Sequence, residues 1–188
     1  MSPQILTPAN QLTILRMAFI PIFVILLVYN HHGWAFLIFV LAGITDGLDG
    51  LMARWLHQKT ALGALLDPIA DKLLLTTSFV VLSVKDLSFP NSLPLWLAIL
   101  VISRDVFLIV SALIILVSTE HRHFPPSIFG KAATLIQILT LTLVLFFNYR
   151  ALTPDWLFSL YVLTGIITVF SGLHYTYRGK RMVSQEQR

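Results

Sequence analysis

Six long apolar runs restrict this chain to a helical membrane protein. A bilayer offers no water to the backbone, so apolar segments of about 20 residues cross it as helices that satisfy their own hydrogen bonds. Only 12% of the 188 residues are charged, against about 25% in a soluble domain. We therefore expect an all-α, integral membrane bundle of six transmembrane helices, forming a single domain over residues 1–188. The expected spans are Leu12–Tyr29, Trp34–Leu56, Gly63–Val84, Pro94–Val117, Lys131–Tyr149 and Trp156–Tyr177.

The segments between the runs carry turn signals, such as His31-His32-Gly33 and Thr153-Pro154. Met1–Gln11 is too short to span, and we expect it to lie along the membrane as an interfacial segment. The chain has no cysteine, which excludes disulfides and thiolate chemistry.

Basic residues are distributed unevenly between the two sides of the expected bundle. An even number of spans puts both termini on one side. The only basic residues in the loops on the opposite side are Lys85 and Arg150. By the positive-inside rule we expect both termini to face the cytoplasm, together with any active site on the same side, and we expect a bacterial inner membrane protein. The net charge of +4 is too small to indicate nucleic acid, but it suits membrane lipids and a phosphate-bearing substrate. The basic residues on the side of the termini are Arg16, Arg54, Lys59, Arg122, Lys131, Arg178, Lys180, Arg181 and Arg188.

Four aspartates lie between the end of the second expected span and the start of the third. Asp46 and Asp49 are three residues apart and Asp67 and Asp71 are four apart, so each pair shares a helix face. A carboxylate in a bilayer costs about 2.5–3.5 kcal/mol on insertion scales, so the four together require a compensating partner. A divalent metal bound through oxygen ligands is such a partner. Asp67, which precedes Pro68, is also a plausible helix cap.

The aspartates belong to a longer pattern that resembles a known signature. From Asp46 to Asp71 the chain reads Asp-x2-Asp-Gly-x2-Ala-Arg-x8-Gly-x3-Asp-x3-Asp, which is similar at every fixed position to the signature of the CDP-alcohol phosphatidyltransferases. The segment from Asn10 to Arg16 is similar to the family's amino-terminal Asn-x-Leu-Thr-x-x-Arg. The resemblance implies transfer of a phosphatidyl group from CDP-diacylglycerol to a glycerol-type alcohol, with release of CMP. It also allows a homodimer, which is common in the family.

The resemblance further implies roles for individual residues. The general base would be Asp71, which is placed one turn from Asp67 to take a proton from the acceptor hydroxyl. The CDP site would include Gly50, Arg54 and Gly63, in which Arg54 supplies a planar cation for phosphate oxygens. Two divalent cations, Mg²⁺ or Mn²⁺, would be held by Asp46, Asp49, Asp67 and Asp71.

The acceptor alcohol is less clearly marked. Ile102-Ser103-Arg104-Asp105-Val106 resembles a segment of cardiolipin synthases, and the second arginine typical of phosphatidylglycerophosphate synthases is missing from Ser111-Ala112-Leu113-Ile114. We therefore expect phosphatidylglycerol as acceptor, with glycerol 3-phosphate as the alternative. Arg104 and Lys131 are the candidates for binding the acceptor's phosphate. Their alternative roles are an internal ion pair of Arg104 with Asp105 and an interfacial anchor at Lys131.

Two other classes of membrane protein use clustered aspartates. A membrane prenyltransferase also holds a diphosphate with paired Asp-rich motifs, but those motifs lack the Gly-x2-Ala-Arg element. A non-enzymatic ion carrier could use intramembrane aspartates as a pathway, but would not need Arg54 and two glycines at fixed spacing. Release of CMP from CDP-diacylglycerol separates the transferase from both.

Overall fold

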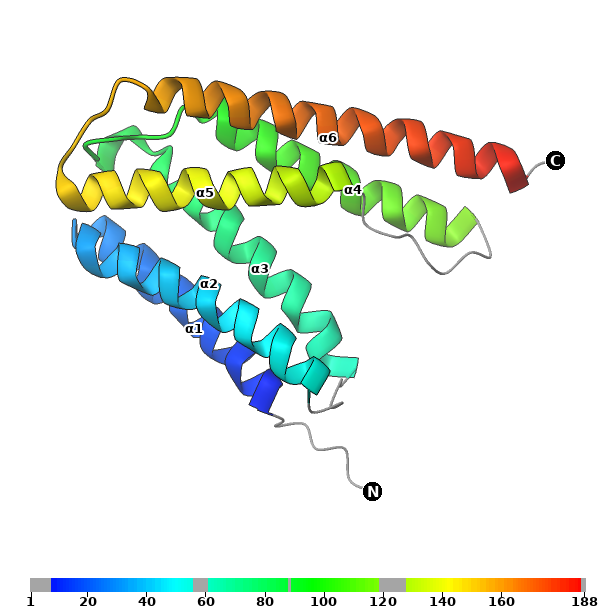
Figure 1. Ribbon diagram of the computed structural model, residues 1–188, viewed down its shortest axis with the longest axis horizontal. Helices are drawn as coiled ribbons and strands as arrows, with labels where there is room; N and C mark the ends of the chain where they lie inside the picture. The colour runs from blue at the N-terminus through cyan, green and yellow to red at the C-terminus, as the bar shows by residue number, and fades with distance from the viewer. Residues whose placement is uncertain (1–7, 56–60, 88, 119–127, 187–188) are drawn as a thin grey trace. The chain divides into compact units, whose positions relative to one another are not determined.

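Six long helices make up the part of the chain that the computed structural model describes. It describes the backbone of residues 8–55, 61–87, 89–118 and 128–186, and the side chains of residues 11–47, 69–87, 89–111 and 128–176. Every helix expected from an apolar run is present (Figure 1). The elements are α1 Pro8–Val28, α2 His32–Trp55, α3 Ala61–Leu82, the 3₁₀ turn η1 Lys85–Leu87, α4 Leu95–Ser118, α5 Ile128–Arg150 and α6 Leu157–Glu186.

Several helices are suited to a membrane by length and composition. Within the described residues, the apolar stretches Gln11–Val28, Ile128–Arg150 and Leu157–Thr176 are long enough to cross one, and α2 has a shorter one, His32–Gly47. This composition fits an integral membrane protein, whereas six crossing helices stay a prediction. α1 begins at Pro8, so the end of the expected interfacial segment is instead the first turn of α1, where proline is well tolerated. Residues 1–7 lie outside the described part.

The helices belong to two compact units. The first, Met1–Ser92 with Thr142–Thr153, contains α1, α2, α3 and the end of α5. The second, Leu93–Leu141 with Pro154–Arg188, contains α4, the start of α5 and α6. The single domain expected over residues 1–188 stays a prediction about how these units assemble.

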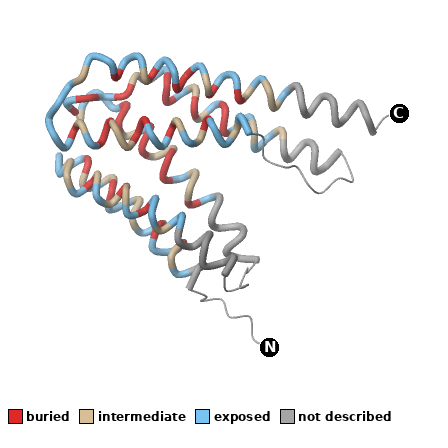
Figure 2. Tube along the Cα trace, viewed as in Figure 1, coloured by how far each residue is buried: buried red, intermediate tan, exposed pale blue. Residues whose placement is uncertain are grey.

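In the first unit, α1 packs against both α2 and α3 (Figure 1). The α1–α2 turn begins at Asn30, whose φ of 59° is left-handed, and the amide of His31 donates to the carbonyl of Leu26 at 2.8 Å. This is the Schellman arrangement that ends a helix and satisfies its last carbonyls. The reversed chain buries Phe23 against Phe39, with ring centroids 5.9 Å apart. Buried and exposed positions therefore alternate along both helices (Figure 2).

Two buried asparagines join the segment after η1 to the end of α5. The backbone amide of Asn91 donates to Oδ1 of Asn148 at 2.7 Å, and Nδ2 of Asn148 donates to the carbonyl of Asn91 at 3.1 Å. Nδ2 of Asn91 also donates to the carbonyl of Leu152 at 2.7 Å. Because these amides satisfy each other away from water, they hold the end of α5 in a defined place in the first unit.

In the second unit, α5 and α6 share a buried polar seam. Nε2 of Gln137 donates to the hydroxyl of Thr168 at 3.1 Å, and the hydroxyls of Thr140 and Thr164 lie 2.7 Å apart. Hydrogen bonds between helices contribute about 0.6–2 kcal/mol each in membranes, where apolar faces alone give little preference for one partner over another. The seam therefore specifies which faces of α5 and α6 meet.

Gly165 provides a test of packing in this unit. A Cβ at this position would lie 2.8 Å from the ring of Trp96, so Gly165→Ala must displace that ring. We expect a loss of about 1–3 kcal/mol in the free energy of unfolding, as for other overpacked sites. Gly43→Ala is the matched control, because nothing lies within 4 Å of its Cβ and alanine favours a helix. Denaturant unfolding in micelles measures both, and equal stabilities would contradict the contact.

Candidate active site

An ion pair between α1 and α2 is the best-described part of the aspartate region. Nη1 of Arg16 lies 2.5 Å from Oδ1 of Asp46. The Arg16 side chain is only 1% exposed, whereas that of Asp46 is 46% exposed. The buried cation thus has an anionic partner, as a charge at this depth requires. The carboxylate of Asp46 is tethered to α1 and still accessible from outside.

Arg16 is a site residue that the sequence interpretation missed. The sequence places it in the amino-terminal pattern and among the basic residues on the side of the termini, without a role in the site, yet it is one of the largest fully buried side chains of the described part. Thr13, one helical turn earlier, is buried as well. The available signal was the amino-terminal Asn-x-Leu-Thr-x-x-Arg pattern, which contains both residues. α1 therefore contributes directly to the aspartate region.

The other expected site residues lie on α2 and α3, within the first unit. Asp71 lies on α3 and its side chain is half-buried. α3 begins at Ala61, six residues before Asp67, so the alternative role of Asp67 as the helix cap is wrong: the helix continues through that position. The side chains of the remaining predicted residues lie outside the described part, namely Asp49, Gly50, Arg54, Gly63 and Asp67.

The described donors fit a hard divalent cation. Asp46 offers an accessible carboxylate held by Arg16, and Asp71 adds a second carboxylate from α3 of the same unit. The chain has no cysteine, so oxygen ligands of the kind preferred by Mg²⁺ or Mn²⁺ dominate. No group of three or more acidic or histidine side chains is found among the described ones, and the predicted cluster needs Asp49 and Asp67 to be complete.

The two candidates for acceptor binding belong to the second unit. Arg104 is buried: its Nη1 donates to Oδ1 of Asp105 at 2.8 Å and its Nη2 donates to the hydroxyl of Ser171 at 2.8 Å. The internal ion pair is therefore present, while Nε of Arg104 has no hydrogen-bond partner among the described residues. Lys131 is exposed in the first turn of α5. Nε of Arg104 is thus a buried donor without a partner among the described residues, whereas the charge of Lys131 is accessible.

Known proteins are similar to this chain over most of its length. The family model for CDP-alcohol phosphatidyltransferase matches residues 6–171. A cardiolipin synthase (CMP-forming) of Streptomyces coelicolor is 36% identical over 139 residues, covering 70% of this chain and 61% of the relative. The cardiolipin synthase (CMP-forming) of Homo sapiens is 31% identical over 196 residues, covering 94% and 63%.

Another relative is named for a different activity from that of the two cardiolipin synthases. A probable phosphatidylglycerophosphate synthase of Mycobacterium tuberculosis is 33% identical over 183 residues, covering 92% of this chain and 81% of the relative. The chain spans only about three-fifths of the length of the two cardiolipin synthases. The match to the family model nevertheless extends over most of the chain and includes the whole aspartate pattern and Arg16. This chain therefore belongs to the CDP-alcohol phosphatidyltransferase family.

Proposed function

We propose that this protein is a phospholipid-synthesising transferase that moves a phosphatidyl group from CDP-diacylglycerol to a glycerol-type alcohol and releases CMP. The observation that carries the proposal is the complete signature from Asp46 to Asp71 on α2 and α3, with Asp46 held by buried Arg16. Membership of the family supports this reaction class over a prenyltransferase or an ion carrier.

In the proposed reaction the acceptor hydroxyl oxygen bonds to the lipid-linked phosphorus of CDP-diacylglycerol, and the bond from that phosphorus to CMP breaks. Asp71 takes the proton that the hydroxyl loses. Arg54 donates hydrogen bonds to diphosphate oxygens, and Gly50 and Gly63 leave room for the nucleotide.

The proposed cofactor is a pair of divalent cations held by the four aspartates. Such cations, when bound, neutralise the charge of the diphosphate and of departing CMP. Arg16 has a supporting part, because it fixes one carboxylate oxygen of Asp46 and thereby limits how that side chain can turn. The accessible side of Asp46 is then the side available to a cation. The oxygen donors of Asp46, Asp49, Asp67 and Asp71 suit Mg²⁺ or Mn²⁺.

The acceptor that we propose is phosphatidylglycerol, with glycerol 3-phosphate as the second candidate. The relatives carry names for both activities. The segment around Arg104 resembles cardiolipin synthases, which favours the first. We further propose that the active site and both termini face the cytoplasm of a bacterium, and that a homodimer is compatible with the fold.

Identification of the lipid product tests the function. Purified protein receives CDP-diacylglycerol and Mg²⁺ with phosphatidylglycerol, glycerol 3-phosphate, inositol phosphate or serine in separate reactions. We expect CMP and cardiolipin with phosphatidylglycerol. Phosphatidylglycerophosphate as the product would instead assign glycerol 3-phosphate as the acceptor. Absence of CMP in every reaction would refute the transferase.

Lys131 provides a test of the acceptor site. Lys131→Ala should raise the apparent KM for the acceptor about tenfold or more, because a hydrogen bond to a charged group contributes about 1.5–3 kcal/mol. The KM for CDP-diacylglycerol should hardly change. Lys85→Ala is the matched control, because it also removes an exposed lysine, but one that belongs to the first unit. Equal effects on both substrates, or none on either, would make Lys131 an interfacial anchor.

A further inference from the structure

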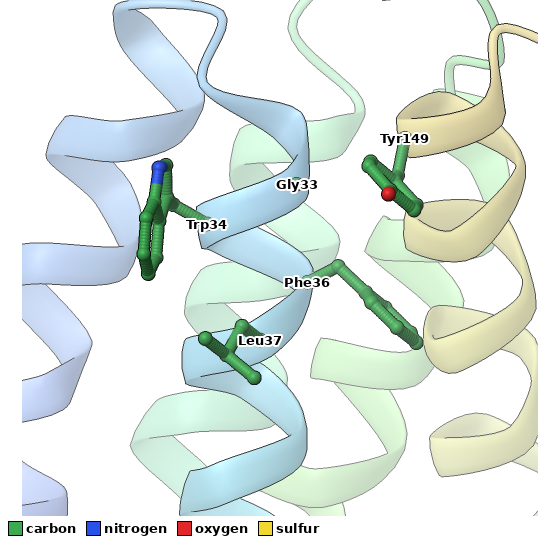
Figure 3. A pocket seen from close by; sticks show the side chains of 5 residues that line it. All are labelled: Gly33, Trp34, Phe36, Leu37 and Tyr149. Atoms are coloured by element: carbon green, nitrogen blue, oxygen red, sulfur yellow. The ribbon is translucent and has the colours of Figure 1, made fainter.

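A shallow apolar trough lies in the first unit, far from the aspartates. Its volume is about 370 Å³, near the lower end of the roughly 300–1,000 Å³ of small-ligand sites. Gly33, in its floor, precedes Asp46 by 13 helical residues, which is about 20 Å at 1.5 Å per residue. The trough is therefore separate from the candidate active site. It is lined by Gly33, Trp34, Phe36, Leu37 and Tyr149 (Figure 3).

The shape of the trough depends on the missing side chain of Gly33. A Cβ there would lie 2.9 Å from Cδ2 of Tyr149, so the tyrosine ring packs directly on bare backbone. The ring of Phe36 is parallel to that of Tyr149, with centroids 6.4 Å apart, and meets the ring of Phe146 edge-on at 5.8 Å. Figure 3 shows Trp34 and Leu37 on one side of Gly33 and Phe36 and Tyr149 on the other. The trough thus has two apolar walls and a backbone floor.

The backbone next to Tyr149 is held in place by hydrogen bonds. Tyr149 follows Asn148, whose side chain is tied to Asn91 by the paired amide hydrogen bonds described above. Both walls are accessible, because Trp34 on the opposite wall is 64% exposed and Tyr149 is 53% exposed. The trough is therefore accessible to a ligand and yet has one wall whose backbone is fixed.

The position of the trough along the helices indicates the kind of ligand. The apolar stretches of α1 and α5 end at Val28 and Arg150, so the trough lies at the level where these membrane-compatible segments end. Tryptophan and tyrosine favour this depth, where the acyl chains of a bilayer give way to head groups. Arg150, which directly follows Tyr149 and ends α5, is exposed, so an exposed cation adjoins one of the residues that line the trough.

We propose that this trough binds one anionic phospholipid from the leaflet opposite to the aspartates. An acyl chain lies along the apolar surface that Trp34, Phe36 and Leu37 present in the trough. The phosphate lies at the rim, where Arg150 complements its negative charge. A zwitterionic phospholipid has the same chains but carries no net charge for Arg150, so the site prefers the anionic lipid. One such cation gives a preference of about fivefold.

Fluorescence quenching by brominated lipids tests the site in the intact chain. The protein is reconstituted into phosphatidylcholine vesicles with increasing fractions of phosphatidylglycerol whose acyl chains are dibrominated. The signal of Trp34 is obtained as the difference between the wild type and Trp34→Phe. The signal of Trp156, which is also exposed, is obtained in the same way from Trp156→Phe and serves as the matched control. CDP-diacylglycerol is omitted, so the result does not depend on the proposed activity.

We expect the Trp34 signal to reach half of its quenching at about one-fifth of the brominated phosphatidylglycerol fraction that Trp156 needs. Brominated phosphatidylcholine should show no such difference between the two tryptophans. Arg150→Gln should abolish the preference for the anionic lipid, whereas Lys85→Gln, which removes the other exposed cation near this end of the unit, should keep it. Identical curves for both tryptophans in the wild type would mean ordinary boundary lipid and would overturn the proposal. Absence of quenching at Trp34 would overturn it too, since protein such as a second copy would then cover the trough.

Discussion

Asp71→Asn is expected to lower kcat by about 10²–10⁴-fold, the usual contribution of a general base. The amide has nearly the same shape as the carboxylate but cannot accept a proton from the acceptor hydroxyl. Binding of CDP-diacylglycerol should be affected much less than turnover, because the remaining aspartates still face the diphosphate. The measurement is steady-state kinetics at saturating Mg²⁺, combined with a direct assay of CDP-diacylglycerol binding.

Asp49→Asn is the matched variant that separates a metal ligand from the base. It makes the same change from carboxylate to amide within the aspartate pattern. Because an amide is a poorer metal ligand than a carboxylate, we expect the activity of Asp49→Asn to recover in part as the Mg²⁺ concentration is raised. The activity of Asp71→Asn should recover much less, because this substitution removes the proton acceptor as well as a metal ligand. A near wild-type rate of Asp71→Asn at saturating metal would show that Asp71 is not the base.

Arg16→Ala is expected to lower the free energy of unfolding by about 2–5 kcal/mol, the range for truncation of a large buried side chain. The substitution empties the space between α1 and the chain around Asp46 and also removes the ion pair. Because Asp46 then loses its tether, the Mg²⁺ concentration for half-maximal activity should rise as well. Unfolding in micelles and metal titration of activity measure the two effects. Arg150→Ala, which truncates an exposed arginine of the same unit, should change neither.

A double-mutant cycle distinguishes the ion pair from packing alone. Arg16→Met keeps much of the side-chain volume without the charge, and Asp46→Asn removes the charge of the partner. Residues in direct contact usually show coupling of about 0.5–3 kcal/mol in such cycles. Additive effects of the two substitutions on unfolding would contradict the contact between Arg16 and Asp46.

The helices could be predicted from the sequence because a bilayer leaves little choice. Long apolar runs must be helical there, and asparagine and proline occur at their boundaries: Asn30 follows the end of α1, and Pro94 directly precedes the start of α4. The aspartate pattern could be read for the same reason, since four carboxylates have no place in apolar helices without a function. The family follows from this local spacing alone, which requires no knowledge of how the helices pack.

The contacts between helices could not be predicted from the sequence. An apolar helix has no clear inward face, because lipid and protein interior accept the same residues, so its pattern does not predict its neighbours. The sequence assigned Arg16 to the side of the termini, but only the packing of α1 against α2 shows that it is buried and paired with Asp46, 30 residues away. The need for a glycine at position 33 is likewise explained only by the ring of Tyr149, 116 residues later, which packs against it. Local composition and spacing were enough to predict the helices and the family. The contacts that orient Asp46 and shape the trough join residues far apart in the chain, so only their packing revealed them.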